Sequence, residues 1–185
     1  MATADDIEAM RDVERDAGRR FLGFPADTGL HEIAADDPPE AEVLAAHIDN
    51  DAAWVVTDAG EVVAYAVASM IDDDAHLDQV SVRMSHQGRG IGTILVEVVC
   101  DWASSLDFEA VSLTTFRDVP FNGPFYAARV RRGGRGPLRR RTAVVARPRA
   151  LSGPRRAAAD RDAPDAGVTS ASRRAAGQPG TIRAI

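Results

Sequence analysis

The stretch His86-Gln87-Gly88-Arg89-Gly90-Ile91-Gly92 decides how the rest of the chain is interpreted. Its three glycines within five residues permit backbone angles that other residues resist, and they let the backbone approach a ligand closely. A helix-like apolar pattern begins at once, so the free amides and the positive dipole end of that helix would point into the turn. Such a turn suits the phosphates of a nucleotide or coenzyme, although many glycine turns only join a strand to a helix.

The segments around the turn predict a strand before it and a helix after it. Residues 76–82 are rich in β-branched side chains and alternate in part, as a half-buried strand does. Residues 110–116 predict a further strand, and Asn122-Gly123-Pro124-Phe125-Tyr126 follows. The apolar residues at helical spacing after the turn are Ile91, Ile94, Leu95, Val98, Val99, Trp102 and Leu106. The turn spells Q-x-x-G-x-G and no ribose-binding acid follows about 20 residues on, so this is not a Rossmann pattern.

The chain before the turn adds two helices and a hairpin. Asp5-Asp6 predicts the cap of a helix that carries Ile7, Met10, Val13 and Ala17 on one face. Residues 38–48 predict a second, short helix. Residues 54–57 and 62–71 predict two strands, which Asp58-Ala59-Gly60-Glu61 joins as a hairpin turn. The whole order is helix, helix, three strands, helix and strand, which defines an α/β domain.

In this order of elements, and in Gln87, Gly90, Gly92, Asn122 and Phe125-Tyr126, the chain resembles the GNAT superfamily of acetyl-CoA-dependent N-acyltransferases. The resemblance implies the GNAT fold, a mixed central sheet flanked by helices. The family usually has a strand before the first helix and two more strands after the helix that holds Tyr126. We expect this chain to lack the first strand and the last two, because little sequence precedes Asp5 and the composition changes after Tyr126.

The charge changes sign near Tyr126. Residues 1–124 contain 7 Arg and 25 Asp plus Glu, a net charge of −18, whereas residues 125–185 contain 15 Arg and 3 Asp, a net charge of +12. All ten aromatic residues lie at or before Tyr126. Such a tail cannot bury enough apolar surface to offset its ordering entropy. We therefore divide the chain into a GNAT core over residues 1–128 and an Arg/Ala/Gly/Pro-rich tail over residues 129–185, which we expect to be disordered.

Three interpretations of the tail remain open. It is a neutral disordered extension, a basic arm for nucleic acid, or the product of a shifted reading frame in a GC-rich gene. The tail has no aromatic residue for base stacking and no lysine, so nucleic acid is the least favoured partner. The codons of Ala127–Val130, read from the second base, can spell Gln-Arg-Gly-Phe, and the family typically continues its Tyr with Gly-Phe after a few residues.

Composition and length bound the remaining possibilities. About 125 foldable residues make one domain with a modest core. No apolar run is long enough to span a membrane and no signal peptide opens the chain, so we expect a cytoplasmic protein without a membrane partner. The single Cys100 excludes an internal disulfide and is expected in the core. A homodimer is left open.

The resemblance implies acetyl-CoA as co-substrate and no metal. The turn amides would bind the pyrophosphate, and the backbone of the preceding strand would pair with the pantetheine arm. Asn122 would contact that arm, or else cap the helix that holds Tyr126. The implied coenzyme-binding residues are Val80, Ser81, Val82, Gln87, Gly88, Arg89, Gly90, Ile91, Gly92, Thr93 and Asn122.

Transfer of an acyl group to an amine needs a neutral amine, and the departing thiolate is better protonated. The resemblance implies Tyr126 as the proton donor to the thiolate; the alternative is an aromatic ring packed under the sheet. Some family members place a glutamate near position 79, but Gln79 cannot titrate, so Asp78, His76 or a base acting through water are the candidates. Strand alternation predicts His76 and Asp78 on one face and Gln79 on the other.

The expected function is transfer of acetyl from acetyl-CoA to a primary amine of a small molecule or peptide by direct attack. The acidic surplus of residues 1–124 would attract a cationic amine. Asp36-Asp37 and Asp72-Asp73-Asp74 either line the acceptor groove or form a solvated face. Arg117-Asp118-Val119-Pro120 lies where acceptors bind in the family. The alternative is a non-catalytic or unstable GNAT remnant that at most binds coenzyme A.

Overall fold

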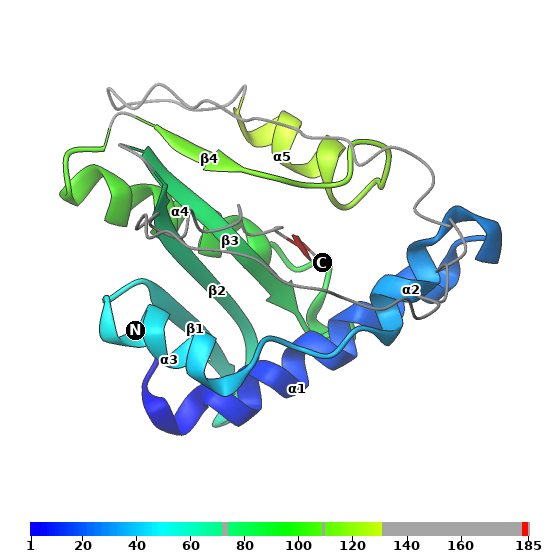
Figure 1. The fold of residues 1–185 in the computed structure, drawn as a ribbon, viewed down its shortest axis with the longest axis horizontal. Helices are drawn as coiled ribbons and strands as arrows, with labels where there is room; N and C mark the ends of the chain where they lie inside the picture. The colour runs from blue at the N-terminus through cyan, green and yellow to red at the C-terminus, as the bar shows by residue number, and fades with distance from the viewer. Residues whose placement is uncertain (72–73, 109, 131–182, 185) are drawn as a thin grey trace, which may run out of the picture.

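A mixed β-sheet, with the strand order β1-β2-β3-β4, forms the centre of the fold (Figure 1). The computed structural model describes residues 1–71, 74–108, 110–130 and 183–184. The four strands are β1 (Ala53–Asp58), β2 (Glu61–Ile71), β3 (Asp74–Val82) and β4 (Val111–Leu113). Strands β1, β2 and β3 are antiparallel neighbours, whereas β3 and β4 run parallel. A two-residue strand, β5 (Arg183–Ala184), also pairs in parallel with β3, opposite Gln79 and Val80.

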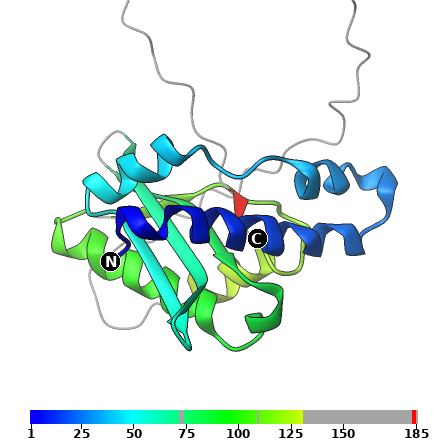
Figure 2. The same ribbon diagram turned by 90° about the horizontal axis from the view of Figure 1, so that it is seen from below.

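Five α-helices and several short 3₁₀ turns surround this sheet. The helices are α1 (Ile7–Gly18), α2 (Leu30–Ala35), α3 (Ala41–Asp49), α4 (Ile91–Ser105) and α5 (Gly123–Val130) within the described residues. The 3₁₀ turns are η1 (Ala4–Asp6), η2 (Arg19–Gly23), η3 (Ala26–Thr28) and η4 (Met84–His86). In Figure 2, α1 crosses the sheet with α3 above it. Among the described helices, none is long and apolar enough to cross a membrane.

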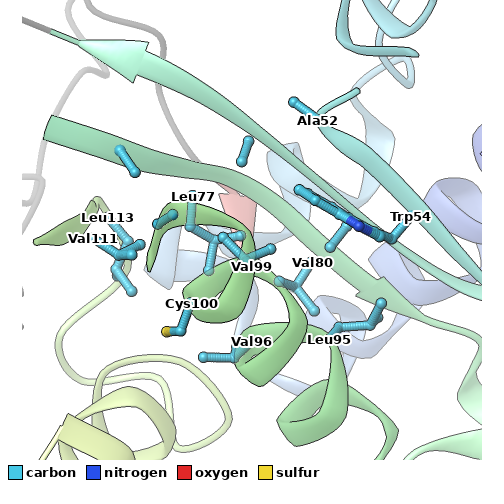
Figure 3. Close-up of a cluster of buried hydrophobic side chains, with 14 of the residues drawn as sticks. Ala52, Trp54, Leu77, Val80, Leu95, Val96, Val99, Cys100, Val111 and Leu113 are labelled. Atoms are coloured by element: carbon cyan, nitrogen blue, oxygen red, sulfur yellow. The ribbon is translucent and has the colours of Figure 1, made fainter. Parts of the chain in front are cut away.

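Two apolar clusters fix the helices to opposite faces of the sheet. The larger cluster joins α4 to the strands, with Leu77, Val80 and Leu95 among its buried members, and it contains the predicted core residue Cys100 (Figure 3). The smaller cluster joins α1 and α3 to β1 and β2 through Met10, Leu44 and Tyr65. Alternation along β2 supplies both, because Ala64, Ala66 and Ala68 face α4 while the residues between them face α1.

The predicted start of the first helix and the predicted hairpin are confirmed. The Asp6 carboxylate accepts hydrogen bonds from the Thr3 backbone N–H at 2.8 Å and from the Thr3 hydroxyl at 2.9 Å, which fixes the entry to α1. In the hairpin turn, Ala59 and Gly60 have φ values of 51° and 85°. Two successive left-handed residues form the turn whose twist matches a two-stranded antiparallel ribbon.

Other element boundaries differ from the sequence expectations. The second predicted helix begins at Ala41 rather than at residue 38, because Pro39 restricts Pro38 to extended backbone. The strand predicted over residues 110–116 is reduced to β4, and α2 was not predicted. Two residues expected on the inner face of α4 are exposed: Ile94 lies beside the buried stripe, and Leu106 follows the last turn of the helix.

A β-bulge in β3 corrects the predicted face assignment. Val67 of β2 pairs with Gln79 and Ala68 pairs with Leu77, so Asp78 is an extra residue without a partner in the ladder. Leu77 and Val80 consequently face the same cluster although they are three residues apart. His76 and Gln79 therefore both face the α1 side, whereas strict alternation had separated them.

The structure describes residues 1–4, before the first helix, but only a few residues of the predicted tail. Residues 1–4 form no strand, although the Ala2 N–H donates a hydrogen bond of 2.9 Å to the Ala53 carbonyl of β1. The predicted tail lies outside the described residues over 131–182 and at 185, as do Asp72 and Asp73 of the acidic turn. Strand β5, inside the predicted tail, was not expected.

Candidate active site

A cavity of about 300 Å³ opens where β3 ends and α4 begins. Strand β3, the glycine turn, α4, α5, η2 and the loop before α5 all contribute to its wall. The lining residues are Arg20, Val80, Val82, His86, Gln87, Gly88, Gly90, Ile91, Gly92, Thr93, Phe121, Phe125 and Tyr126. Residues of the predicted phosphate turn and the predicted proton donor therefore share one cavity.

The glycine turn has the geometry of an anion site. Gly88 and Gly90 have φ values of 76° and 86°, a region that side chains with a Cβ resist. Gly90 is the N-cap of α4, a 15-residue helix, and the described residues supply no side-chain cap hydrogen bond at this position. The first amides of α4 and the positive end of the helix dipole can therefore bind a phosphate.

Two side chains hold the turn in place. The Gln87 side-chain amide donates a 2.9 Å hydrogen bond to the Val82 carbonyl at the end of β3. The Nε2 atom of His86 lies 3.1 Å from the Asp58 carboxylate in the β1–β2 hairpin. These contacts fix the orientation of the turn relative to the sheet before any ligand binds.

Eight of the eleven predicted coenzyme residues line the cavity; the exceptions are Ser81, Arg89 and Asn122. Ser81 is fully buried and faces α1 instead, and Arg89 is exposed. Asn122 is also fully buried, and its side-chain nitrogen and oxygen have no hydrogen-bond partner among the described residues. Its side chain therefore does not cap α5, and a buried amide of this kind gains free energy when a ligand satisfies it.

Tyr126 lines the cavity and also packs against Phe125. It is only 2% exposed, and its ring meets Phe125 edge-on with centroids 4.9 Å apart. Its backbone N–H donates to the Asn122 carbonyl at 3.0 Å in the first turn of α5. The ring is thus held rigidly in the cavity wall, a position open both to a packing role and to a proton-donating role.

A tight loop closure positions α5. The Gly123 N–H donates to the Phe116 carbonyl at 2.9 Å, so the loop after β4 returns to its own start. A Cβ on Gly123 would lie 2.2 Å from the Arg117 carbonyl oxygen and 2.8 Å from its carbon. Only glycine fits there, and the closure brings Tyr126 into the cavity wall.

The two predicted base candidates lie on β3 outside the cavity lining. His76 is buried, its Nδ1 atom lies 2.7 Å from the Ser112 hydroxyl, and its Nε2 atom has no partner among the described residues. Burial lowers the pKa of His76, partly offset by the nearby Asp78. Burial raises the pKa of Asp78, although a hydrogen bond from Ser69 and the nearby His47 and His76 oppose that shift.

A buried polar cluster around Glu14 was missed at the sequence level. The Glu14 carboxylate accepts hydrogen bonds from the Tyr65 hydroxyl at 2.8 Å, the Gln79 amide at 3.0 Å and the Ser81 hydroxyl at 2.5 Å. The cluster explains why Gln79 and Ser81 face α1. A signal was present in the sequence, since Glu14 lies at the apolar spacing of Met10, Val13 and Ala17 on the inner face of α1.

An aromatic cluster beside the cavity was also missed. Phe21 of η2 meets Phe116 and Phe121 edge-on, with centroids 5.9 and 5.4 Å apart, and Phe24 lies 6.0 Å from Phe121. The cluster ties η2 to the loop before α5. These residues lie in irregular segments, where no periodic pattern reveals which side chains meet.

Strand β5 lies along the part of β3 where a coenzyme arm is expected. It pairs with Gln79 and Val80, and Val80 was expected to pair through its backbone with pantetheine. In this structure, some main-chain groups of β3 near the cavity are therefore engaged by Arg183–Ala184.

Residues 11–129 match a family model described as the Acetyltransferase (GNAT) family. The chain therefore belongs to the GNAT family of acetyltransferases, as its glycine turn and element order predicted. The match supports an N-acetyltransferase-type enzyme.

Two solved structures with TM-scores above 0.5 show the same fold at low sequence identity. PaiA N-acetyltransferase from Thermoplasma acidophilum, in complex with coenzyme A, is 14% identical with a TM-score of 0.56, over 71% of this chain and 85% of that one. The BH1408 protein of Bacillus halodurans, as a tetramutant, is 14% identical with a TM-score of 0.53, over 73% of this chain and 93% of that one. The ribosomal-protein-S18-alanine N-acetyltransferase from Escherichia coli is 19% identical with a TM-score of 0.43, and the match spans 58% of this chain and 59% of that enzyme.

Proposed function

We propose that this chain transfers an acetyl group from acetyl-CoA to a primary amine of a small molecule or peptide by direct attack. The observation that carries the proposal is the single cavity that joins the Gly88–Gly90 turn, the uncapped amides of α4 and Tyr126. This combination provides an anion site and a hydroxyl donor within one wall, which acyl transfer from a coenzyme thioester requires.

The residues present fit the coenzyme. The turn amides at Gln87–Thr93 would hold the pyrophosphate, and the backbone of Val80–Val82 would pair with the pantetheine arm in place of Arg183–Ala184. The unpartnered amide of Asn122 is a further candidate for the arm. Binding in this order would bring the thioester near Tyr126, which lines the same cavity.

The proton transfers follow from the chemistry of the attacking amine and the leaving thiolate. The amine nitrogen loses one proton, its lone pair forms the new C–N bond, and the C–S bond breaks to release a thiolate. The Tyr126 hydroxyl would protonate that thiolate, and the resulting phenolate would regain a proton from solvent after the product leaves. His76, kept neutral by burial, or Asp78 receives the proton of the amine through water, since neither lines the cavity.

The acidic character of residues 1–124 favours an acceptor that arrives as a cation. Their net charge of −18, within a whole-chain charge of −6, would create a negative potential around the core that concentrates ammonium groups there. The same potential disfavours acceptors that carry only negative charge.

A second candidate, a GNAT remnant that binds coenzyme without catalysis, rests on β4. This strand has three residues and is the last one on its side of the described sheet. So short a strand at this end of the described sheet would give α5 and Tyr126 little support.

A thermal unfolding scan with and without acetyl-CoA tests coenzyme binding, and release of free thiol in the presence of an amine panel tests transfer. Acetyl-CoA at about 100 times its dissociation constant should add about 2.7 kcal/mol to the free energy of unfolding. Transfer to at least one amine supports the enzyme, and stabilisation without transfer to any amine supports the remnant. No stabilisation would contradict both.

Two matched glycine variants locate the binding site in that scan. Gly90 in the turn lines the cavity, whereas Gly60 in the β1–β2 hairpin does not. The two glycines have nearly equal positive φ values, and a Cβ on either meets nothing within 4 Å. Gly90→Ala and Gly60→Ala should therefore introduce similar backbone strain, about 1 kcal/mol each. Only Gly90→Ala should reduce the stabilisation by acetyl-CoA; equal responses would place the coenzyme elsewhere.

A further inference from the structure

Arg20 stands apart from the other arginines near α1. Arg11, Arg15 and Arg19 each form an ion pair with the acidic residue three positions earlier in the chain. Arg20 lies in η2, lines the cavity and forms no ion pair with any described residue. Its guanidinium carbon instead lies 3.9 Å from the centroid of the Phe121 ring.

The electrostatics of this arginine are unusual for so acidic a chain. Partial burial lowers the pKa of Arg20, and no carboxylate in the described part of the chain offsets that cost. Stacking on Phe121 compensates in part, because the face of the ring attracts a cation. The N–H donors project from the edge of the guanidinium plane, so stacking leaves them available to a ligand.

The aromatic cluster holds this donor in position. Phe21, the residue after Arg20, is fully buried between Phe116 and Phe121. Both the ring under the guanidinium and the backbone that carries it are thus fixed by the same packing. A donor fixed before binding loses little entropy when it meets its partner.

We propose that Arg20 binds an oxyanion in this cavity, and that the oxyanion is a carboxylate of the acceptor. The acceptor would then be an amine that also carries a carboxylate, such as an amino acid. The guanidinium fork matches a carboxylate in two parallel hydrogen bonds. The coenzyme phosphates have their own site at the glycine turn, and an amino acid still presents the ammonium group that the acidic surface attracts.

This inference rests on the proposed function, and its test compares amino acids with the amines that lack only their carboxylate. Each pair is assayed for acetylation by the intact chain and by Arg20→Gln, Arg20→Lys and Arg19→Gln. The intact chain should prefer the carboxylate-bearing member of the best pair by about 10- to 100-fold in kcat/KM. Arg20→Gln should bring that ratio close to one, and Arg20→Lys should restore part of it.

The control and the acetyl-CoA measurements separate the possible outcomes. Arg19 is exposed and paired with Asp16, so Arg19→Gln should keep the preference. An increase in the KM for acetyl-CoA in Arg20→Gln, with the preference unchanged, would assign Arg20 to a coenzyme phosphate and overturn the acceptor carboxylate. Equal or better use of the amines without a carboxylate would overturn the inference but leave the proposed function intact. A chain that binds acetyl-CoA and acetylates no member of the panel would contradict the proposed function itself.

Discussion

Asp78 combines two properties that rarely occur together in a strand: it is the extra residue of a bulge and a carboxylate whose pKa is raised by burial. Between the ordinary pKa and the raised one, the folded state binds more protons than the unfolded state. Its contribution to stability therefore decreases as pH rises through that window, and at neutral pH the ionised group destabilises the fold. Bulges near active sites redirect side chains, and such residues often trade stability for function.

We expect Asp78→Asn to raise the free energy of unfolding at pH 7, since the buried charge is removed while the shape is kept. The gain should shrink as pH is lowered toward the ordinary carboxyl pKa of 3.8. Urea denaturation at several pH values measures this effect, with Asp101→Asn at an exposed position as the control. A loss of stability in Asp78→Asn at pH 7 would contradict the inference that burial raises the pKa of Asp78. If Asp78 receives the proton of the amine, the same variant should also lower kcat.

Tyr126→Phe removes one hydroxyl and leaves the ring packed against Phe125. If that hydroxyl protonates the thiolate, kcat should fall by about 100-fold or more, the usual contribution of a positioned general acid. The KM for acetyl-CoA and the midpoint of thermal unfolding should change little. Steady-state kinetics and an unfolding scan on the same preparation check this. A variant with unchanged kcat would assign Tyr126 to packing alone.

At the scale of elements, the closure at Gly123 links the loop after β4 to α5 and hence to the cavity. Gly123→Ala places a Cβ within 3.0 Å of three backbone atoms of Arg117, which cannot rotate away as a flexible side chain could. We expect a loss of about 1 to 3 kcal/mol in the free energy of unfolding, typical of overpacking, together with loss of acetyl-CoA binding. Chemical denaturation and a coenzyme titration measure the two effects.

Gly23→Ala is the matched control for that substitution. Gly23 lies in η2 with ordinary backbone angles, and a Cβ there would meet nothing within 4 Å. Its replacement should leave both measurements close to those of the unchanged chain. Equal behaviour of the two variants would mean that the loop adapts without disturbing α5.

The elements also explain which features could be predicted from the sequence. The glycine turn, the hairpin and the start of the first helix depend on local residue types, and a local pattern was enough to predict them, although the Asp6 side chain binds Thr3 rather than the amides of α1. The bulge at Asp78 depends on how β3 pairs with β2, so alternation alone gave the wrong face for Gln79. The packing of Phe21 on Phe121 joins residues that are far apart in irregular segments, where no period guides a prediction. Glu14 was readable from its place on the inner face of α1 but was passed over.

For the whole molecule, the charge of residues 1–124 leads to a prediction about salt. Raising the ionic strength from about 0.1 M to about 1 M shortens the Debye length from about 10 Å to about 3 Å. Attraction of a cationic acceptor to the acidic surface should weaken accordingly, so kcat/KM for an amino acid with a positively charged side chain should fall several-fold. An amino acid without net charge should respond much less. Kinetics at constant pH with both acceptors test this, and a salt-independent rate for the cationic amino acid would show that the acidic surface does not steer the substrate.

The edge-on pair of Trp54 and Trp102 gives the protein a built-in optical reporter. The centroids of the two indole rings lie 5.6 Å apart and the ring planes meet at 73° in the larger apolar cluster, which joins α4 to the strands. They are the only tryptophans in the sequence. Near-ultraviolet circular dichroism and fluorescence emission therefore arise largely from one place, the contact between β1 and α4. A titrant that fills the cavity without disturbing this contact should leave the emission maximum unchanged, whereas loosening of the sheet from α4 should shift it to the red.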